Sequence, residues 1–212
     1  MPSVGTVPAA HKSRPTAGTL GFRVKSGWAS AVVLVGPAKA PELRDRRIVE
    51  LSDPAVPESK QPYHARTGML EEDPAKLDRR IKIVRAAAAK AVSMLVEFCR
   101  DAGCEIRGAG LVVGSLIDPT SIKNPHIRAH ALEGQLFRTV LEDSLRSHQI
   151  PCRVIVERNA FSGAETLLRC SLEDVKQTLL NLGRSQKGPW RVDDKLAALA
   201  AWLTLAAMRT AH

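Results

Sequence analysis

The order in which strand-like and helix-like segments follow one another constrains this fold more than any other feature of the sequence. Three short segments rich in apolar and β-branched residues come first, at residues 19–24, 28–35 and 46–52. A tight turn at residues 25–27 joins the first two as a hairpin, and no helical segment separates the second from the third. We therefore expect the folded part of the chain to begin with an antiparallel meander of three strands.

Helical and strand-like segments alternate after the meander. Apolar residues recur every three or four positions between residues 76 and 103, which predicts a long amphipathic helix that ends at Gly103. A nearly continuous run of apolar and small residues at 106–114 is typical of a strand buried on both faces of a parallel sheet. The pattern continues with a helix at 124–148, a strand at 152–157 and helices at 171–183 and 193–209.

This order predicts an α/β domain with a mixed five-stranded sheet and helices on both faces, because right-handed crossovers must connect the later strands. A three-strand antiparallel meander followed by αβαβα is the order of the ribonuclease H-like fold. A Rossmann fold is disfavoured, since no helix separates the first three strands and no G-x-G-x-x-G motif follows the first one.

We expect one folded domain over residues 19–212. Residues 1–18 are rich in Pro, Ala, Ser and Thr, which predicts a disordered tail. Residues 53–76 contain four prolines and show no helical or strand period. They predict a long loop that serves as a mobile flap or as an arm that binds a partner.

Charge and composition limit the classes of partner. The chain has 31 Lys and Arg against 22 Asp and Glu and a net charge of +9, which favours an acidic partner such as nucleic acid. Aromatic residues make up only 4%, which argues against a platform for stacking single-stranded bases. There is neither a signal-peptide core nor an apolar run long enough to span a membrane, so we expect a cytoplasmic protein without membrane contact. The four cysteines have no metal-ligand spacing and are expected to be free thiols.

Two stretches resemble a known family. The stretch "LGFRVKSGWASAVVL" is similar to the opening hairpin of RuvC-like resolvases, in which a strand ends in D-P-G and turns into a second strand. The stretch "VKQTLLNLGRSQKG" followed by "VDDKLAALAAWLTLA" is similar to the end of that family, where a VK…G-x-x-x-K segment precedes a last helix with D-x-x-D-A-L-A. Together with the strand order, this resemblance to the RuvC-like branch of the ribonuclease H-like superfamily covers residues 19–207.

The resemblance implies a nuclease site, but this sequence lacks most of its parts. The family uses carboxylates from the first strand, the end of the fourth strand and the last helix to hold two Mg²⁺ ions, which activate water and stabilise the leaving oxygen of a phosphodiester. Arg23 stands at the first-strand position, and Gly114 and Ser115 follow the fourth strand in place of an acid. Asp194 matches the first aspartate of the last helix, whereas Ala197 stands at the second. Because a positive side chain repels bound cations, a two-metal nuclease is disfavoured and a degenerate pseudo-nuclease is expected.

The same edge of the sheet remains a candidate binding site, because ligands of open α/β sheets bind at the carboxyl ends of the strands. Basic and polar side chains are expected to meet there, helped by the amides at helix N-termini. The candidate residues for binding nucleic acid or another anion are Arg23, Lys25, Ser115, Arg128, Arg158, Asn159 and Lys187.

The segment "NPHIRAHALEG" predicts a helix that begins near this edge, with Asn124 as its N-cap and Pro125 at its first position. His126, His130 and Glu133 fall within about 60° of one another on such a helix, and residues of these types can ligate zinc. The zinc-protease motif requires a glutamate directly after the first histidine, where this chain has an isoleucine. Three interpretations stay open for these side chains: structural or surface groups, acid–base or ligand-binding groups, and a metal site.

Three hypotheses about function follow from these observations. The first is a catalytically degenerate domain that binds nucleic acid or a nucleoprotein partner through a basic edge, without a cofactor. The second is an enzyme with a non-standard site that could use Mg²⁺ or Zn²⁺, and its candidate catalytic residues are His126, His130, Glu133, Glu157 and Asp194. The third is a scaffold or interaction protein, for example a homodimer that pairs through the loop or the exposed edge of the third strand.

Overall fold

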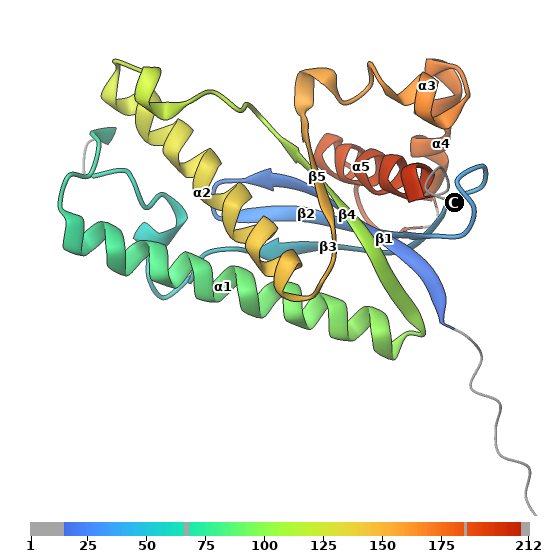
Figure 1. Cartoon of the computed structure of the whole chain (residues 1–212), viewed down its shortest axis with the longest axis horizontal. Coiled ribbons are helices and arrows are strands. Elements are labelled where there is room, and N and C mark those ends of the chain that lie inside the picture. The colour runs from blue at the N-terminus through green and yellow to red at the C-terminus, as the bar shows by residue number, and fades with distance from the viewer. Residues whose placement is uncertain (1–14, 66–67, 185, 209–212) are drawn as a thin grey trace, which may run out of the picture.

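Five strands form one mixed sheet, and helices cover both of its faces (Figure 1). This arrangement is seen in a computed structural model that describes residues 15–65, 68–184 and 186–208. Most of the predicted tail, residues 1–14, and the predicted end of the last helix at Arg209 lie outside the described residues.

The first three strands make the antiparallel meander that the sequence predicts. β1 (Thr16–Lys25) pairs with β2 (Trp28–Val35), and β2 pairs in turn with β3 (Glu42–Glu50). β4 (Cys104–Val113) joins the other side of β1 in parallel, and β5 (Cys152–Val156) joins β4 in parallel. The order across the sheet is β3-β2-β1-β4-β5, so the carboxyl ends of β1, β4 and β5 meet at one edge. The predicted mixed five-stranded sheet is thereby confirmed.

The two faces of the sheet carry different helices. α1 (Pro74–Asp101) and α2 (Pro125–Ser147) pack side by side against one face, where the core contains Leu20 and Phe22 of β1 (Figure 1). α5 (Val192–Met208) lies on the opposite face and contacts β1, β2 and β4. The short α3 (Ala164–Leu168) and α4 (Leu172–Arg184) pack against α5 in turn.

Glycines in the central strands let α5 approach the sheet closely. A Cβ atom added to Gly21 of β1 would lie 1.9 Å from the carbonyl oxygen of Ala197, a distance that no real contact allows. Nearer the start of β1, Thr19 donates a hydrogen bond of 2.9 Å from its hydroxyl to the carbonyl of Ala201. Because Thr19 contacts α5 further along the helix than Gly21 does, α5 runs antiparallel to β1. Its N-terminus therefore lies at the carboxyl edge of the sheet.

The long helices begin with side-chain caps that the sequence encodes locally. Asn124 accepts a hydrogen bond from the amide of Ile127 at 3.1 Å, and Pro125 occupies the first position of α2, as predicted. Asp73 caps α1 in the same manner by accepting from the amides of Ala75 and Lys76. These caps fix where α1 and α2 start, and for α2 that point lies close to the carboxyl edge.

The predicted strands β1 and β3 are too short, because their ends depend on partners far away in the chain. β1 begins at Thr16, where residues 16–18 pair with the start of β4. β3 spans Glu42–Glu50 rather than 46–52, and its first residues pair with the end of β2. Neither pairing leaves a signal in the local sequence.

The described residues of the segment 53–73, which we call the arm, form a loop across one end of α1. The arm holds one turn of 3-10 helix, η1 (Pro57–Lys60), and an isolated bridge between His64 and Leu70. Arg80 of α1 donates to the carbonyls of Pro62 and His64, at 2.9 and 3.2 Å. The Arg80 side chain of α1 thus holds the arm in place by donating to its backbone carbonyls, a feature that the proline-rich composition did not predict.

None of the helices in the described part of the chain combines the length and the apolar character that crossing a bilayer requires.

Candidate functional site at the carboxyl edge of the sheet

A cleft of about 370 Å³ opens at the carboxyl edge of the sheet. Its walls are the turn after β1, the loop that follows β4 and one face of α2. The loop contains η3 (Pro119–Ser121), which Asp118 caps by accepting from the amide of Thr120. The charged and imidazole side chains among the lining residues are Arg23, Lys25, Asp118, His130 and Arg138.

Arg23 lies at the base of this cleft and is only 5% exposed. Its guanidinium forms an ion pair with Glu157, which directly follows β5, and its Nε lies 3.8 Å from a carboxylate oxygen of Asp193 in α5. Its remaining terminal nitrogen donates to the carbonyl of Val24 at 2.8 Å. Lys25 completes the group, with its Nζ 3.3 Å from the same oxygen of Asp193. We call Arg23, Lys25, Glu157 and Asp193 the arginine cluster.

The two positive side chains of the arginine cluster are balanced by its two carboxylates. A buried charge is tolerated only when opposite charges and hydrogen bonds compensate it, and here two carboxylates face two cations. The carboxylates come from the end of β5 and the start of α5, where the fold brings three elements together. Glu157 and Asp193 are therefore both engaged by basic side chains of the same chain.

Asp194 lies apart from the arginine cluster, although the sequence match singled it out. Its carboxylate accepts from the hydroxyl of Ser30 at 2.7 Å and from the amide of Arg191 at 2.9 Å, and Arg46 lies 3.9 Å away. With an exposure of 3%, it joins the start of α5 to β2 and β3. These internal contacts argue against the catalytic role that the family's pattern suggested for Asp194. The neighbouring Asp193, which the family's pattern does not single out, is the one that reaches Arg23.

The remaining candidate anion-binding residues do not all reach the cleft. Ser115 lines it. Hydrogen bonds from Thr120, and to a smaller extent the charge of Arg128, hold the pKa of Asp118 below its ordinary value. Arg128 itself is half-buried. Arg158 and Asn159 are exposed in η4 (Glu157–Asn159), next to the arginine cluster.

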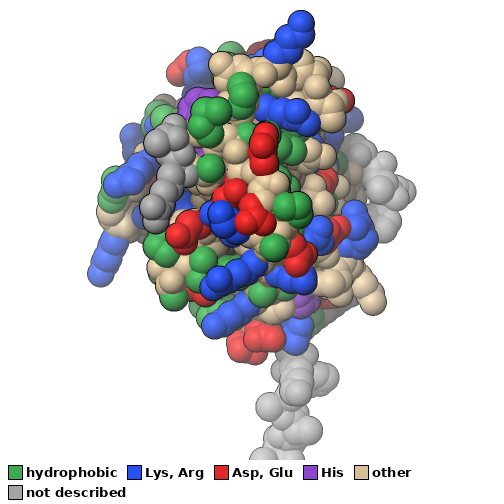
Figure 2. Space-filling model, turned by 90° about the vertical axis from the view of Figure 1, so that its left-hand side faces the viewer, with side chains coloured by type: hydrophobic (Ala, Val, Ile, Leu, Met, Phe, Trp, Pro, Cys, Tyr) green, Lys and Arg blue, Asp and Glu red, His purple; other side chains and the backbone are tan. Residues whose placement is uncertain are grey.

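Lys187 lies elsewhere, because its carbonyl accepts from Arg46 of β3. The predicted basic pocket is thus only partly assembled, since Arg23 is neutralised and Lys187 is absent from it. Arg138 lines the cleft without having been predicted, and it is paired with Glu142 at 3.4 Å. On the face that Figure 2 shows, Lys and Arg side chains are interleaved with Asp and Glu side chains rather than forming a uniform basic patch.

Three histidines meet beside the cleft. His126 and His130 lie one turn apart on α2, and His64 reaches them from the arm. The ring centroids are 4.5 to 5.1 Å apart, and one ring nitrogen from each lies within 4.8 Å of the other two. The Nε2 atoms of His126 and His130 are separated by 3.3 Å. We call these three side chains the histidine cluster.

Oxygen atoms of Glu133 and Gly68 lie close to the Nδ1 atoms of the histidine cluster. Glu133 of α2 is fully buried, and its Oε1 lies 2.7 Å from Nδ1 of His64, while its Oε2 lies 3.7 Å from Nδ1 of His130. The carbonyl of Gly68 lies 2.9 Å from Nδ1 of His126. Burial raises the pKa of Glu133, against which the hydrogen bond from His64 acts. Burial, followed by the charges of His64 and His126, lowers the pKa of His130.

The predicted acid–base group is split between the two clusters. His126, His130 and Glu133 come together as their helical spacing indicated, but Glu157 belongs to the arginine cluster. His64 was not predicted as a partner, because it lies in the arm and has no spacing relation to α2. The two clusters nevertheless share one site, since His130 and Arg23 line the same cleft.

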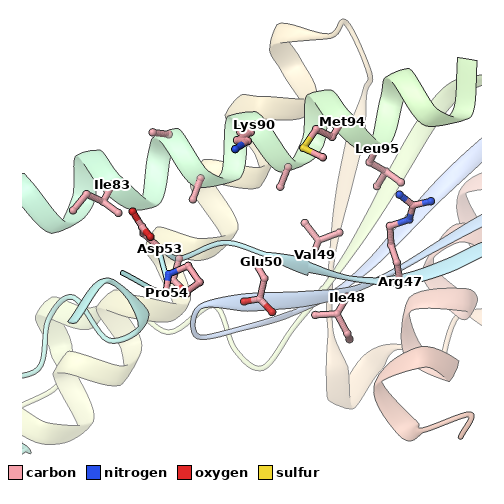
Figure 3. Close-up of a pocket in the computed structure, with 14 residues that line it drawn as sticks. Arg47, Ile48, Val49, Glu50, Asp53, Pro54, Ile83, Lys90, Met94 and Leu95 are labelled. Carbon is pink, nitrogen blue, oxygen red and sulfur yellow. The ribbon is translucent and has the colours of Figure 1, made fainter. Parts of the chain in front are cut away.

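A second hollow lies away from this edge. It measures about 580 Å³ and runs between β3, the last strand of the sheet on that side, and α1 (Figure 3). In Figure 3, Met94 and Leu95 extend from α1 toward Val49 of β3. The groove is mainly apolar and includes neither of the two clusters, so the cleft remains the candidate site.

Comparisons with solved structures find the same fold. RuvC of Thermus thermophilus superposes with a TM-score of 0.52 at 10% identity, over 92% of this chain and 96% of that chain. T. thermophilus RuvC in complex with a Holliday junction substrate gives a TM-score of 0.54, with the same identity and coverage. No family model matches this sequence, and the comparison with curated proteins found no match either. The chain therefore has a ribonuclease H-like fold of the RuvC type, as its sequence predicted.

Proposed function

We propose that this ribonuclease H-like domain binds nucleic acid at the carboxyl edge of its sheet and does not carry out two-metal hydrolysis there. The observation that carries the proposal is the arginine cluster. Arg23 takes the position on β1 where RuvC-like nucleases have a metal-binding carboxylate, and its guanidinium is paired with Glu157 and Asp193. A protein cation thus stands where the family's chemistry needs a metal cation.

Two further features argue against two-metal catalysis at this point. The fourth strand ends at Val113 and is followed by Gly114 and Ser115, so it supplies no carboxylate. Ala197, at the position of the second aspartate of the last helix, is fully buried, and its carbonyl lies against Gly21. A metal ion in the place of the Arg23 guanidinium would have Glu157 and Asp193 as its carboxylate ligands, and it would have to displace Arg23 and Lys25 from them.

Nucleic acid is the partner class that fits the charge. The chain carries a net charge of +9, and the phosphate backbone is the commonest acidic partner of basic domains. Lys25, Arg128 and Arg158 lie in or beside the cleft, and the side chain of Lys25 stays 37% exposed despite its pair with Asp193. The solved RuvC complex holds a Holliday junction, which makes branched DNA a natural first ligand to test.

The salt dependence of binding tests this proposal. Fluorescence anisotropy would measure affinity for a labelled four-way junction, a duplex and a single strand between about 50 and 200 mM salt. In the variant Lys25→Ala/Arg128→Gln/Arg158→Ala, we expect an affinity loss of about tenfold or more. We also expect a shallower slope in a plot of the logarithm of the binding constant against the logarithm of the salt concentration. Its magnitude should fall by up to about 3, or about one for each phosphate that is no longer neutralised.

A matched control removes the same charge from the opposite edge. Lys39 in the turn after β2, Arg100 near the end of α1 and Arg107 near the start of β4 are exposed there. The variant Lys39→Ala/Arg100→Gln/Arg107→Ala should retain most of the affinity for nucleic acid and most of its dependence on salt concentration. Equal losses in the two variants would mean that net charge alone governs binding, and absence of binding at the lowest salt would refute the proposal.

A further inference from the structure

We propose that His64, His126 and His130 bind one zinc ion at the rim of the cleft, with Glu133 and the carbonyl of Gly68 as supporting groups. This site is separate from the arginine cluster and does not depend on the nucleic-acid proposal. It uses different residues from the carboxylates that hold metal in RuvC-like nucleases.

The distances between the ring nitrogens suit a tetrahedral ion. Nitrogen ligands at about 2.0–2.1 Å from zinc lie about 3.3 Å apart when they are arranged as the corners of a tetrahedron. The Nε2 atoms of His126 and His130 are 3.3 Å apart, and His64 contributes a nitrogen within 4.8 Å of both. Small rotations of the side chains would bring all three to one ion.

The supporting groups fix the form of histidine that binds metal. A carbonyl oxygen can only accept, so Nδ1 of His126 carries a proton toward Gly68 and leaves the lone pair on Nε2. When ionised, the carboxylate of Glu133 likewise accepts from Nδ1 of His64, at 2.7 Å. Metal-bound histidines nearly always donate their second nitrogen to a carboxylate or a backbone carbonyl. Two of the three histidines already have this arrangement.

His64 gives an independent reason to place an ion here. Its Nε2 is buried and has no hydrogen-bond partner among the described residues. A hydrogen bond between His126 and His130 would satisfy those two rings and leave His64 unsatisfied. One ion satisfies all three nitrogens.

The arm holds His64 in position before any metal arrives. Arg80 donates to the carbonyl of His64 and pairs with Glu71, which lies at 3.2 Å and whose amide donates to the carbonyl of Tyr63. His126 and His130 are held by the helix itself. The site therefore needs little ordering when it binds metal.

The donor set selects the class of metal. Imidazole nitrogen suits zinc, copper, nickel and iron, whereas magnesium and calcium prefer oxygen. Three protein ligands leave a fourth tetrahedral position for water or another ligand, which is typical of zinc sites that are not purely structural. Because His130 lines the cleft, the ion lies at the rim of the candidate site.

Metal content and affinity of the full chain, produced without a histidine tag, test the inference. The protein would be stripped with a chelator and titrated calorimetrically with ZnCl₂ alone, and bound zinc would be counted by elemental mass spectrometry. We expect one zinc per chain. Cobalt in its place should give the strong visible absorption of a tetrahedral ion.

Variants locate the ion. His126→Ala and His130→Ala change exposed side chains and should each weaken zinc binding by about 100-fold or more, while Glu133→Gln should weaken it by about 10- to 100-fold. His148→Ala is the matched control, because His148 ends the same helix and contacts Ser93 instead of the cluster. Circular dichroism would verify that each variant is folded.

Two results would overturn the inference. One is an unmodified protein that binds no zinc. The other is zinc that stays bound with unchanged affinity in folded His126→Ala and His130→Ala, since the metal would then lie elsewhere, for example at the cysteines.

Discussion

Arg23 is the residue that most changes what the carboxyl edge can do. A side chain of this charge is rarely buried unless it is paired, and Arg23 has a carboxylate from the end of β5 and another from the start of α5 within reach. The same carboxylates would otherwise repel each other across the edge. Arg23 thus holds the two carboxylates at this edge in internal ion pairs.

Removing Arg23 should destabilise the protein. In Arg23→Ala, Glu157 and Asp193 lose their common partner, and we expect a loss of about 2–3 kcal/mol in the free energy of unfolding measured in urea. This is less than for a fully buried pair, because the side chain of Glu157 is 41% exposed. The control Lys82→Ala breaks an exposed pair with Asp78 and should cost below about 0.5 kcal/mol. Similar losses in the two variants would contradict the role assigned to Arg23.

Sequence reasoning finds individual site residues wherever helical spacing alone decides proximity. His126, His130 and Glu133 are grouped correctly, because one helix carries all three. His64 is missed, since the path of the arm is set by contacts with Arg80 that no spacing rule encodes. The family's pattern favours Asp194 over Asp193. Only the way α5 packs on the sheet shows that Asp193 is the one that faces Arg23.

At the scale of elements, α5 determines the geometry of the edge. Its close approach to β1 and β4 depends on Gly21 and Gly110, which face Ala197 and Ala200 of the helix. This contact fixes the position of α5 on the sheet, and hence the position of Asp193 relative to Arg23. A change in this packing should therefore affect the arginine cluster as well as stability.

Gly21→Ala tests the close packing of α5. The new methyl group would meet the carbonyl of Ala197 at 1.9 Å, so the helix must move, and we expect a loss of about 3 kcal/mol or more in unfolding free energy. Gly134→Ala is the control, because an added Cβ there meets nothing within 4 Å on an exposed turn of α2. That change should stabilise the protein by up to about 1 kcal/mol. A small loss of unfolding free energy in Gly21→Ala would contradict the close contact between β1 and α5.

Element types are predictable from the sequence, and element ends less so. The periods of α1, α2 and α5 and the apolar run of β4 are local signals, so the order of elements and the mixed sheet follow from them. The extra residues of β1 and β3 arise from pairing with distant strands. α3 has only five residues and follows an exposed turn, and its sequence carries no cap that would have marked it.

At the scale of the whole molecule, one edge of a ribonuclease H-like sheet carries two clusters of different character. The arginine cluster and the histidine cluster both border the same cleft, through Arg23 and Lys25 on one side and His130 on the other. The arm, which Arg80 of α1 holds in place, contributes His64 to the histidine cluster. The fold is shared with RuvC of Thermus thermophilus at 10% sequence identity.

A single assay that scores binding and cleavage together separates a nucleic-acid-binding pseudo-nuclease from an active nuclease. Labelled four-way junction DNA would be incubated with the full chain at low salt, with and without Mg²⁺, and analysed on native and denaturing gels. We expect a retarded complex on the native gel and intact strands on the denaturing gel under both conditions. Mg²⁺-dependent cleavage that Glu157→Gln or Asp193→Asn abolishes, or the lack of any complex, would contradict this function.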